Sequence, residues 1–327
     1  MAGMAQVGFS WHHLLTDWQL SPFALFVLAV CLATAVWYLN ASWKLAARGR
    51  RWSGGRTLSF LGGLLAIDLA LQSSVATFTA SYFQAHVVQH LLLMVIGPPL
   101  LALGAPMTLA LQTSSHGTKV RLLGILNSRP FKAITHPIVV WGLYYGTMFA
   151  FFLTFFLGYA MEHMWVMDLV NLGFFFASTL FWWPIVSLDP IPHWKMSHGT
   201  RMGNLLIGVP VEAFLGLALV STTHSAAPMY SLSSTHSGGA ILWVGAEVFT
   251  FIAIIPIFLQ WVRADERQAR RNDARLDAAA AAGGAVPVPT LAEERSTEPV
   301  GAGPVGAEPG RRRSAWLPQT RPEDAFG

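Results

Sequence analysis

The chain has 327 residues, of which 53% are hydrophobic and only 12% are charged. Because a soluble domain carries about 25% charged residues, this composition excludes an ordinary soluble protein and indicates one that crosses a membrane several times. The formal net charge of +4 does not indicate a nucleic-acid partner, because the basic residues gather in connections between apolar segments. The single cysteine, Cys31, excludes disulfides, iron–sulfur clusters and zinc ribbons.

Seven runs of roughly 20 apolar residues predict seven transmembrane helices and an all-α, multi-pass fold. In chain order they lie near 21–40, 57–78, 84–111, 136–158, 165–187, 203–223 and 239–262. The third run is the longest and has two prolines in its middle. The lipid bilayer is therefore the expected surroundings of most of the chain.

All 21 Lys and Arg residues fall on one side of the predicted helices. They follow the first, third, fifth and seventh runs, whereas the first 43 residues and the other three connections contain none. By the positive-inside rule, the N-terminus is predicted outside and the C-terminus in the cytoplasm. An odd number of spans requires the two ends to lie on opposite sides, so the helix count and the charges agree.

Four segments are predicted along the chain, and the last of them is rich in Gly, Pro, Ala and Glu, a composition typical of disorder. They are an external N-terminal segment at 1–20, the seven-helix domain at 21–262, a charged cytoplasmic helix at 263–282 and a disordered cytoplasmic tail at 283–327.

Histidine and methionine gather at the predicted outer side, where Lys and Arg are missing. Seven of the eleven histidines lie there, together with four methionines: His12, His13, His86, His90, His163, His224, His236, Met161, Met164, Met167 and Met229. A face rich in imidazole and thioether without fixed cations suits a soft metal ion such as Cu(I). For any single histidine in these loops, an interfacial role without a metal is the more common alternative.

His86 and His90 differ from the loop histidines because they lie within the third apolar run, in HVVQHLLLMVIGPPLLALGAP. Spaced four apart, they share one helix face, and Met94 continues the same face one turn deeper. Imidazole inside a membrane segment is costly and usually has a partner or a function. The spacing suits Cu(I), zinc or an axial haem ligand, and equally a pair of helix–helix hydrogen bonds involving Gln89.

Pro98 and Pro99 lie just below the histidine pair and remove two amide donors. The carbonyls that they free, near Met94 and Val95, have to be satisfied by neighbouring helices or line a cavity. We therefore expect the pair to bend or break the third helix, either to make room for a site or only for packing.

Four acidic residues lie within the apolar runs, where no Lys or Arg is available to pair with them. They are Asp68, Asp168, Glu212 and Glu247. Asp68 and Glu212 are expected near mid-depth, either protonated or hydrogen-bonded to each other or to a histidine. Glu247 matches His90 in depth, so it is a candidate to accept from an imidazole or to join a metal's shell.

Several blocks of the sequence resemble one family. HVVQHLLLMVIGPPLLALGAP resembles the signature of the seven-helix CtaG-type cytochrome c oxidase assembly factors of bacterial membranes, especially their actinobacterial members. Further blocks are similar to the same family over roughly residues 10–277: LLTDWQLSP, RGRRWSGGRTLSF, LNSRPFKAITHP, LFWWPIVSLDPIP, GGAILWVGAE and WVRADERQARR.

This resemblance implies a role in the maturation of a haem–copper oxidase and maps the family's histidine pair onto His86 and His90. Relatives have further histidines where this chain has Met167, Asn171 and Gly173, so that second set does not carry over by identity. Met167 would then supply a thioether ligand at one of these positions.

We therefore predict a bacterial plasma-membrane protein that assists oxidase assembly by binding or passing Cu(I) at the outer face. The predicted ligands are His86 and His90, with Met94 and Glu247 as further candidates, and the predicted partners are oxidase subunits. The alternatives are a haem-binding electron carrier, a copper transporter and a scaffold without metal. No nucleophile–base–acid arrangement is compatible with the predicted topology, so no enzymatic activity is expected, and the sequence does not indicate an oligomeric state.

Overall fold

The computed structural model describes residues 18–187, 189 and 196–281, and every regular element in this part of the chain is a helix. The predicted tail at 283–327 and most of the segment at 1–20 lie outside these residues. The helices are α2 (Pro22–Ala47), α3 (Gly54–Gln72), α4 (Ser74–Phe78), α5 (Phe83–His90), the π-helical η1 (Leu91–Ile96), α6 (Gly97–Leu103), α7 (Pro106–Thr113), α8 (His116–Leu126), α9 (Arg129–Ile134), α10 (Pro137–Phe152), α11 (Phe156–Glu162), α12 (Met164–Val186), α13 (His198–Ser221) and α14 (Leu232–Ala281).

Six helical stretches are long and apolar enough to cross a membrane, or seven if one bent pair counts as a single span. This confirms the predicted all-α, multi-span fold. Which end of the helices faces the cytoplasm remains a prediction from the charges. The chain divides into two units, Met1–Gln268 and Ala269–Gly327, and the first contains the other candidate spans together with α14 up to Gln268.

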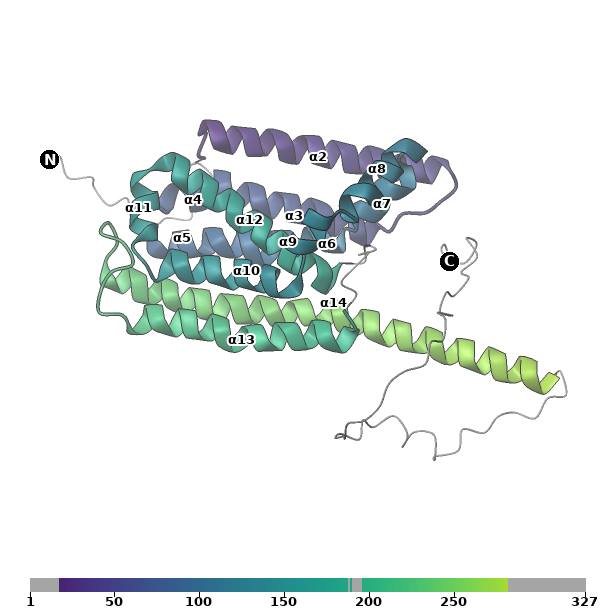
Figure 1. Cartoon of the computed structure of the whole chain (residues 1–327). Helices are drawn as coiled ribbons and strands as arrows, with labels where there is room; N and C mark the ends of the chain where they lie inside the picture. Colours follow the sequence, from purple (N-terminus) through teal and green to yellow (C-terminus); the bar gives the residue numbers. More distant parts are fainter. Residues whose placement is uncertain (1–17, 188, 190–195, 282–327) are drawn as a thin grey trace, which may run out of the picture. The chain divides into compact units, whose positions relative to one another are not determined.

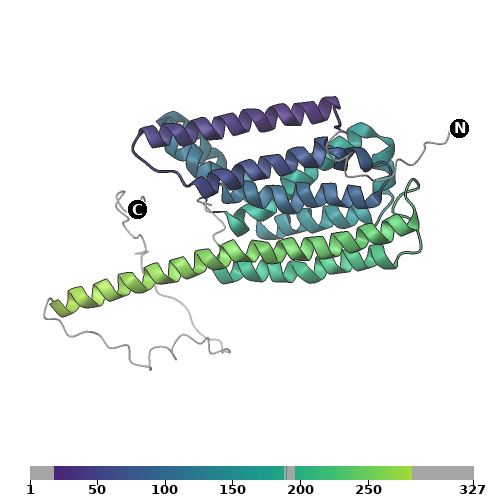
Figure 2. The ribbon, with the colours of Figure 1, turned by 180° about the vertical axis from the view of Figure 1, so that it is seen from behind.

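The helices of the first unit run alongside one another (Figures 1 and 2). α2 lies at one edge, and α13 with the first part of α14 lies at the opposite edge in both views. Between them, α6 packs against both α3 and α12, while α12 also packs against α10. The third span is therefore central, and its residues are shielded from lipid by neighbours on several sides.

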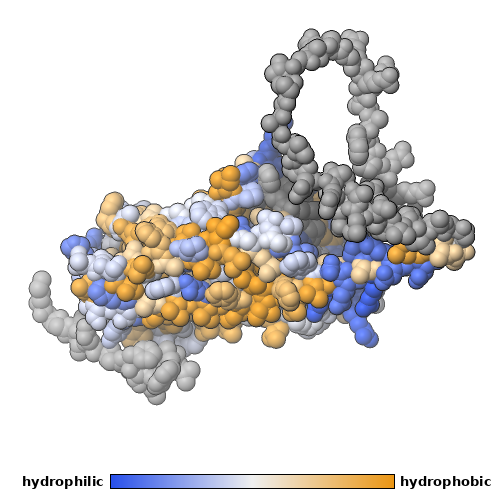
Figure 3. Space-filling model, turned by 90° about the horizontal axis from the view of Figure 1, so that it is seen from below, coloured by the Kyte–Doolittle hydropathy of each residue, from blue (hydrophilic) through white to orange (hydrophobic). Residues whose placement is uncertain are grey.

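The surface of this bundle is largely apolar, as expected where side chains meet lipid. Exposed large hydrophobic residues occur on most of the long helices, and α2 alone presents Leu25, Phe26, Val30, Leu32 and Val36. Figure 3 shows hydrophobic side chains spread across the face that it views.

Serine begins many of the helices and satisfies one of the amides of the first turn. The side chains of Ser21, Ser73, Ser115, Ser128 and Ser197 each accept from a backbone N–H two or three residues on. These are the residues preferred at helix N-caps, because the first four amides of a helix lack partners within it.

The third span does not end at its two prolines. The α-helix changes to the π-helical η1 directly after His90 and returns to α-helix at Gly97. Pro98 has no N–H for the carbonyl of Met94, and Trp182 of α12 donates to that carbonyl instead, with Nε1 and O 2.9 Å apart. A neighbouring helix thus satisfies one freed carbonyl, as predicted, and the helix continues through a π-helical segment.

The fourth span differs from the single helix predicted at 136–158. α10 ends at Phe152, and α11 follows at an angle of 76°. Thr154 lies at the break, where its hydroxyl donates to the carbonyl of Ala150 and accepts from the amide of Phe156. A side chain that takes over these backbone partners competes with the helix ladder, which accounts for the bend.

Two buried charged residues connect helices at the end of the bundle where α7 begins and α12 ends. Asp189 accepts from the amides of Met107 and Thr108, at 3.1 and 2.7 Å, and thereby caps α7 from a distant loop. Burial raises the pKa of Asp189 although these hydrogen bonds lower it. Arg201 of α13 donates to the carbonyls of Ile185 and Ser187 at the end of α12.

Candidate functional site

His86 and His90 form a buried pair in the centre of the bundle. Each side chain is only 1% exposed, and their Nε2 atoms are 2.9 Å apart. The spacing of four residues on α5 places the two imidazoles one turn apart on one helix face, as predicted. One of the two nitrogens must carry a hydrogen and the other a lone pair, since the two atoms share a hydrogen bond.

Tyr230 fixes which nitrogen carries the hydrogen. This residue lies in the connection between α13 and α14, and its hydroxyl donates to the carbonyl of Thr79 at 2.5 Å. Burial raises the pKa of Tyr230 well above its usual value, so the hydroxyl keeps its hydrogen at neutral pH. Because that hydrogen is directed to Thr79, the hydroxyl oxygen accepts from Nδ1 of His86, 3.3 Å away.

The tautomers of both imidazoles follow from this chain of donors. With its hydrogen on Nδ1, His86 presents a lone pair at Nε2, and His90 donates to it through its own Nε2. His90 is then left with a lone pair on Nδ1, for which the described part of the chain offers no hydrogen-bond partner. A buried polar atom without a partner is costly, and such atoms in native proteins usually have a ligand or a function.

Aromatic rings enclose the pair. The rings of Phe174, Phe151 and Phe152 lie 4.9, 5.3 and 5.5 Å from the ring of His90, with their planes nearly perpendicular to it. Phe83 stacks against His86 on the opposite side. These residues come from α10, α12 and α5, so three spans together enclose the pair on the sides where these rings lie.

A small cavity of about 90 Å³ lies beside His86, towards the end of the bundle where α5 begins. Its walls combine polar and sulfur-containing residues with apolar residues of α2, α3 and α4, and they include His86, Gln89, Met161, Met164, Met167, Asp168 and Asn171. Tyr230 connects it with the imidazole, because its hydroxyl also contacts Sδ of Met161 at 3.7 Å. The cavity is called the outer cavity below.

Gln89 does not take part in the histidine pair. Its side chain donates to the carbonyl of Ala70 on α3, at 2.9 Å. The helix–helix hydrogen bond that the sequence suggested therefore exists, but it leaves both imidazoles free for each other and for Tyr230.

Met94 and Glu247, the two further candidate ligands, are placed elsewhere. Met94 lies in η1, where the wider π-helical turn changes its position relative to His90, and its side chain is buried in the main hydrophobic cluster. Glu247 accepts from Nε1 of Trp243, one turn earlier on α14. Neither residue lines the outer cavity.

The other intramembrane acids have local surroundings of their own. Glu212 of α13 is buried and accepts from the hydroxyl of Thr250 on α14, at 3.5 Å. Asp68 has one carboxylate oxygen without a hydrogen-bond partner among the described residues. The predicted bond between these two acids is not found.

The histidines of the loops make local contacts. Nδ1 of His163 is 2.9 Å from the carbonyl of Tyr159, and Nε2 of His236 is 2.8 Å from that of Thr222. His12 and His13 lie outside the described residues. Within the described residues, no three or more His, Cys, Asp or Glu side chains are placed to hold one metal ion. Among the described residues, a further ligand beside the two imidazoles would therefore be a thioether, an amide, a hydroxyl or a carbonyl.

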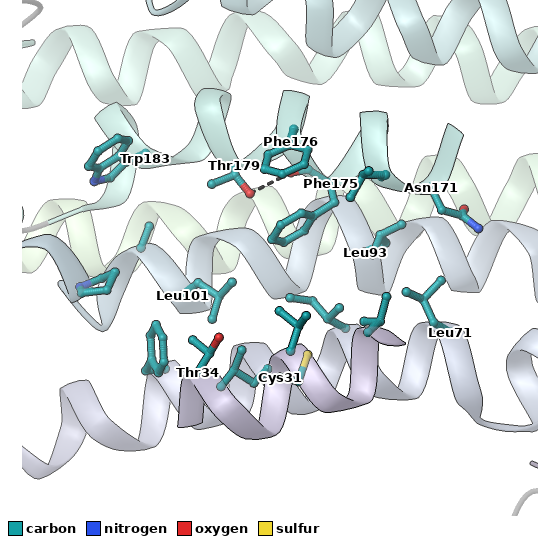
Figure 4. A pocket seen from close by; sticks show the side chains of 18 of the residues that line it. Cys31, Thr34, Leu71, Leu93, Leu101, Asn171, Phe175, Phe176, Thr179 and Trp183 are labelled. Atoms are coloured by element: carbon teal, nitrogen blue, oxygen red, sulfur yellow. Dashed lines mark hydrogen bonds between the residues drawn. The ribbon is translucent and has the colours of Figure 1, made fainter. Parts of the chain in front are cut away.

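A larger cavity, of about 760 Å³, is a different kind of space. Figure 4 shows its wall of aliphatic and aromatic side chains, with Cys31, Thr34 and Asn171 among the few polar groups. It lies between α2, α3, α6 and α12 and has no imidazole in its lining. Its chemistry is that of a lipid-facing hollow, so the candidate site is the histidine pair.

Sequence reasoning missed Tyr230, Thr79 and Trp182, which position this pair and its helix. Tyr230 is distant in sequence and lies in a connection, where no spacing pattern links it to His86. Trp182 belongs to the block LFWWPIVSLDPIP, which indicated a family resemblance but no role for this tryptophan.

The family model for cytochrome c oxidase caa3 assembly factors, Caa3_CtaG, matches residues 36–264, more than two thirds of the chain. An uncharacterized protein of Mycobacterium leprae is 27% identical over 267 residues, which are 76% of this chain and 40% of that protein. Uncharacterized proteins of Mycobacterium bovis and Mycobacterium tuberculosis are 27% identical over 281 residues, or 80% of this chain and 42% of theirs. The chain thus spans about two fifths of the length of these relatives. No solved structure matches.

Proposed function

Because the chain belongs to the cytochrome c oxidase caa3 assembly factor family, we propose that it assists oxidase assembly by holding Cu(I) at His86 and His90 and passing it on. Its helices and its family make it a multi-pass protein of the bacterial plasma membrane. The observation that carries the proposal is the buried pair of Nε2 atoms directed at each other across 2.9 Å.

A monovalent cation bound by both Nε2 atoms replaces the hydrogen that they share, and the two imidazoles turn apart to admit it, because a metal–nitrogen bond of about 2.0 Å is longer than half of the 2.9 Å between these atoms. His86 already has its hydrogen on Nδ1, held by Tyr230, so its Nε2 lone pair is available. His90 becomes a second ligand when its hydrogen moves from Nε2 to the unpartnered Nδ1. No proton is released in this exchange, and each ligand is a neutral imidazole, which suits copper.

The surroundings of the pair support transient binding of a soft ion. The phenylalanine rings lie around the pair, and their faces attract cations. Tyr230 orients His86 as second-shell residues orient metal-binding histidines. Two neutral ligands hold an ion less firmly than a full set, which is an advantage for a protein that must release copper to another.

The rival functions receive less support from this geometry. A haem held by one of these imidazoles and a ligand from another span would need open space beside the ring, but the rings of Phe174, Phe151 and Phe152 lie 4.9, 5.3 and 5.5 Å from that of His90. A copper transporter would need ligands across the membrane, whereas Glu212 is engaged by Thr250. A scaffold without metal would make the same contacts, so a measurement of copper is needed to distinguish it from the proposed function.

The test is the copper content of the oxidase made by cells that carry only a His86→Ala/His90→Ala variant. We expect oxidase with as little copper as in cells that lack this protein. Cells with His163→Ala, a histidine of the same end with only a local contact, should make oxidase with its full copper content. Full copper in oxidase from the double variant, present at normal abundance, would contradict the proposal and favour the scaffold.

A further inference from the structure

We propose that the outer cavity is a second Cu(I) site, formed by the thioethers of Met161, Met164 and Met167 with His86 at its inner wall. This inference rests on the proposed function and adds the position at which Cu(I) first binds before it reaches the histidine pair.

Three methionines from two helices converge on this cavity. Met161 comes from the last turn of α11, and Met164 and Met167 come from the first turn of α12. The bend between α10 and α11 lets α11 pack against α12, so that all three methionines line one space. At about 90 Å³ the cavity has room for an ion with one or two water molecules, each of which takes about 30 Å³ in the liquid.

The donor atoms select the kind of ion. Thioether sulfur is a soft ligand that binds Cu(I), whereas Mg²⁺ and Ca²⁺ require several oxygen ligands. Asp168 also lines the cavity and adds an attractive negative charge, and neither Lys nor Arg is in the lining. The electrostatics thus favour a cation, and the sulfurs favour a soft one.

The exposure of these residues decreases from the surface to the histidine pair. Met164 is 70% exposed, Met161 and Met167 are partly buried, and His86 and His90 are 1% exposed. A methionine that only fills a core would not be the most exposed member of the group. The arrangement is instead that of a path that leads inward from the surface.

His86 connects the two sites. On its Nδ1 side, the hydroxyl of Tyr230 contacts both that nitrogen and Sδ of Met161, at 3.3 and 3.7 Å. On its other side, Nε2 meets His90. The outer cavity therefore adjoins the imidazole pair, and an ion that passes from one to the other exchanges sulfur ligands for nitrogen ligands.

The experiment uses the full chain in detergent, loaded anaerobically with Cu(I) in the presence of a competing chelator. X-ray absorption at the copper edge distinguishes sulfur ligands at about 2.3 Å from nitrogen ligands at about 2.0 Å. The test variant is Met161→Leu/Met164→Leu/Met167→Leu, because leucine conserves volume and removes only the sulfur. Met229→Leu, an exposed methionine outside the cavity lining, is the matched control.

We expect copper–sulfur scattering in the wild type and in Met229→Leu. The triple variant should lose this scattering and should bind less copper than the wild type, by about one ion per chain. His90→Ala should lose nitrogen ligands and keep the sulfur-bound copper, which separates the two sites. Wild-type copper without sulfur neighbours would overturn this inference and leave the histidine proposal intact. Unchanged copper in His90→Ala would instead count against the histidine pair. The wild-type spectrum decides the question even if the triple variant fails to fold.

Discussion

Tyr230 is the residue that turns two neighbouring histidines into a defined pair. It accepts from Nδ1 of His86 and donates to Thr79, so it sets the tautomer of one imidazole and, through it, of the other. The sequence predicts that His86 and His90 share a face, because helix periodicity is a local property. It does not predict Tyr230, because a contact across 144 residues depends on how the spans pack.

Tyr230→Phe removes the hydroxyl and retains the ring. Without an acceptor, Nδ1 of His86 no longer holds its hydrogen in a fixed position, and the Nε2 lone pair is less available. Loss of such an outer-shell partner weakens metal binding by about 10–100-fold, and we expect a loss in this range for Cu(I). Competition titration with a Cu(I) chelator measures it.

Tyr159→Phe is the control, because Tyr159 is exposed and its ring lies against that of His163, with centres 4.4 Å apart. Its affinity for Cu(I) should equal that of the wild type. Equal affinities for wild type and Tyr230→Phe would mean that the hydroxyl does not position the ligand.

The third span illustrates what can be predicted for an element. Its length, its prolines and the need to satisfy a freed carbonyl all follow from sequence and from the absence of water in a bilayer. The π-helical η1 does not, because it depends on Trp182 reaching the carbonyl of Met94 from another helix. Likewise, the bend after α10 arises from the hydroxyl of Thr154, and the effect of this single residue cannot be predicted from the composition of the segment.

Trp182→Phe tests the bond that supports η1. It leaves the carbonyl of Met94 buried without a donor, which costs about 1–3 kcal/mol, and the smaller ring adds a packing loss. We expect a lower unfolding temperature in detergent and reduced Cu(I) binding, since η1 follows directly after His90. Trp165→Phe, at an exposed tryptophan of the same helix, should leave both unchanged. A stable Trp182→Phe protein with normal binding would remove this role from Trp182.

At the scale of the whole molecule, the sequence predicts the number and order of the spans. Each of the seven apolar runs coincides with a helix or, for the fourth, with the bent pair α10 and α11. The family resemblance is confirmed by the match over residues 36–264. Contacts between spans were beyond prediction, because lipid-facing and core-facing positions are equally apolar and leave little periodicity to read.

The predicted orientation can be measured by labelling single cysteines in sealed cells. In a Cys31→Ala background, Thr223→Cys lies in the connection before α14 and Ser53→Cys lies before α3, and both positions are exposed. The positive-inside rule predicts that a membrane-impermeant thiol reagent labels the first and not the second until the cells are opened. Labelling in the opposite pattern would place the outer cavity on the cytoplasmic side.

The central claim is that His86 and His90 hold Cu(I), and the most direct test is the copper content of the purified protein. After anaerobic loading and removal of loosely held Cu(I) by a chelator, the wild type should retain copper, and His86→Ala/His90→Ala should retain less by about one ion per chain. His163→Ala, purified in parallel, should match the wild type. Equal copper in wild type and double variant, with both folded, would contradict the claim.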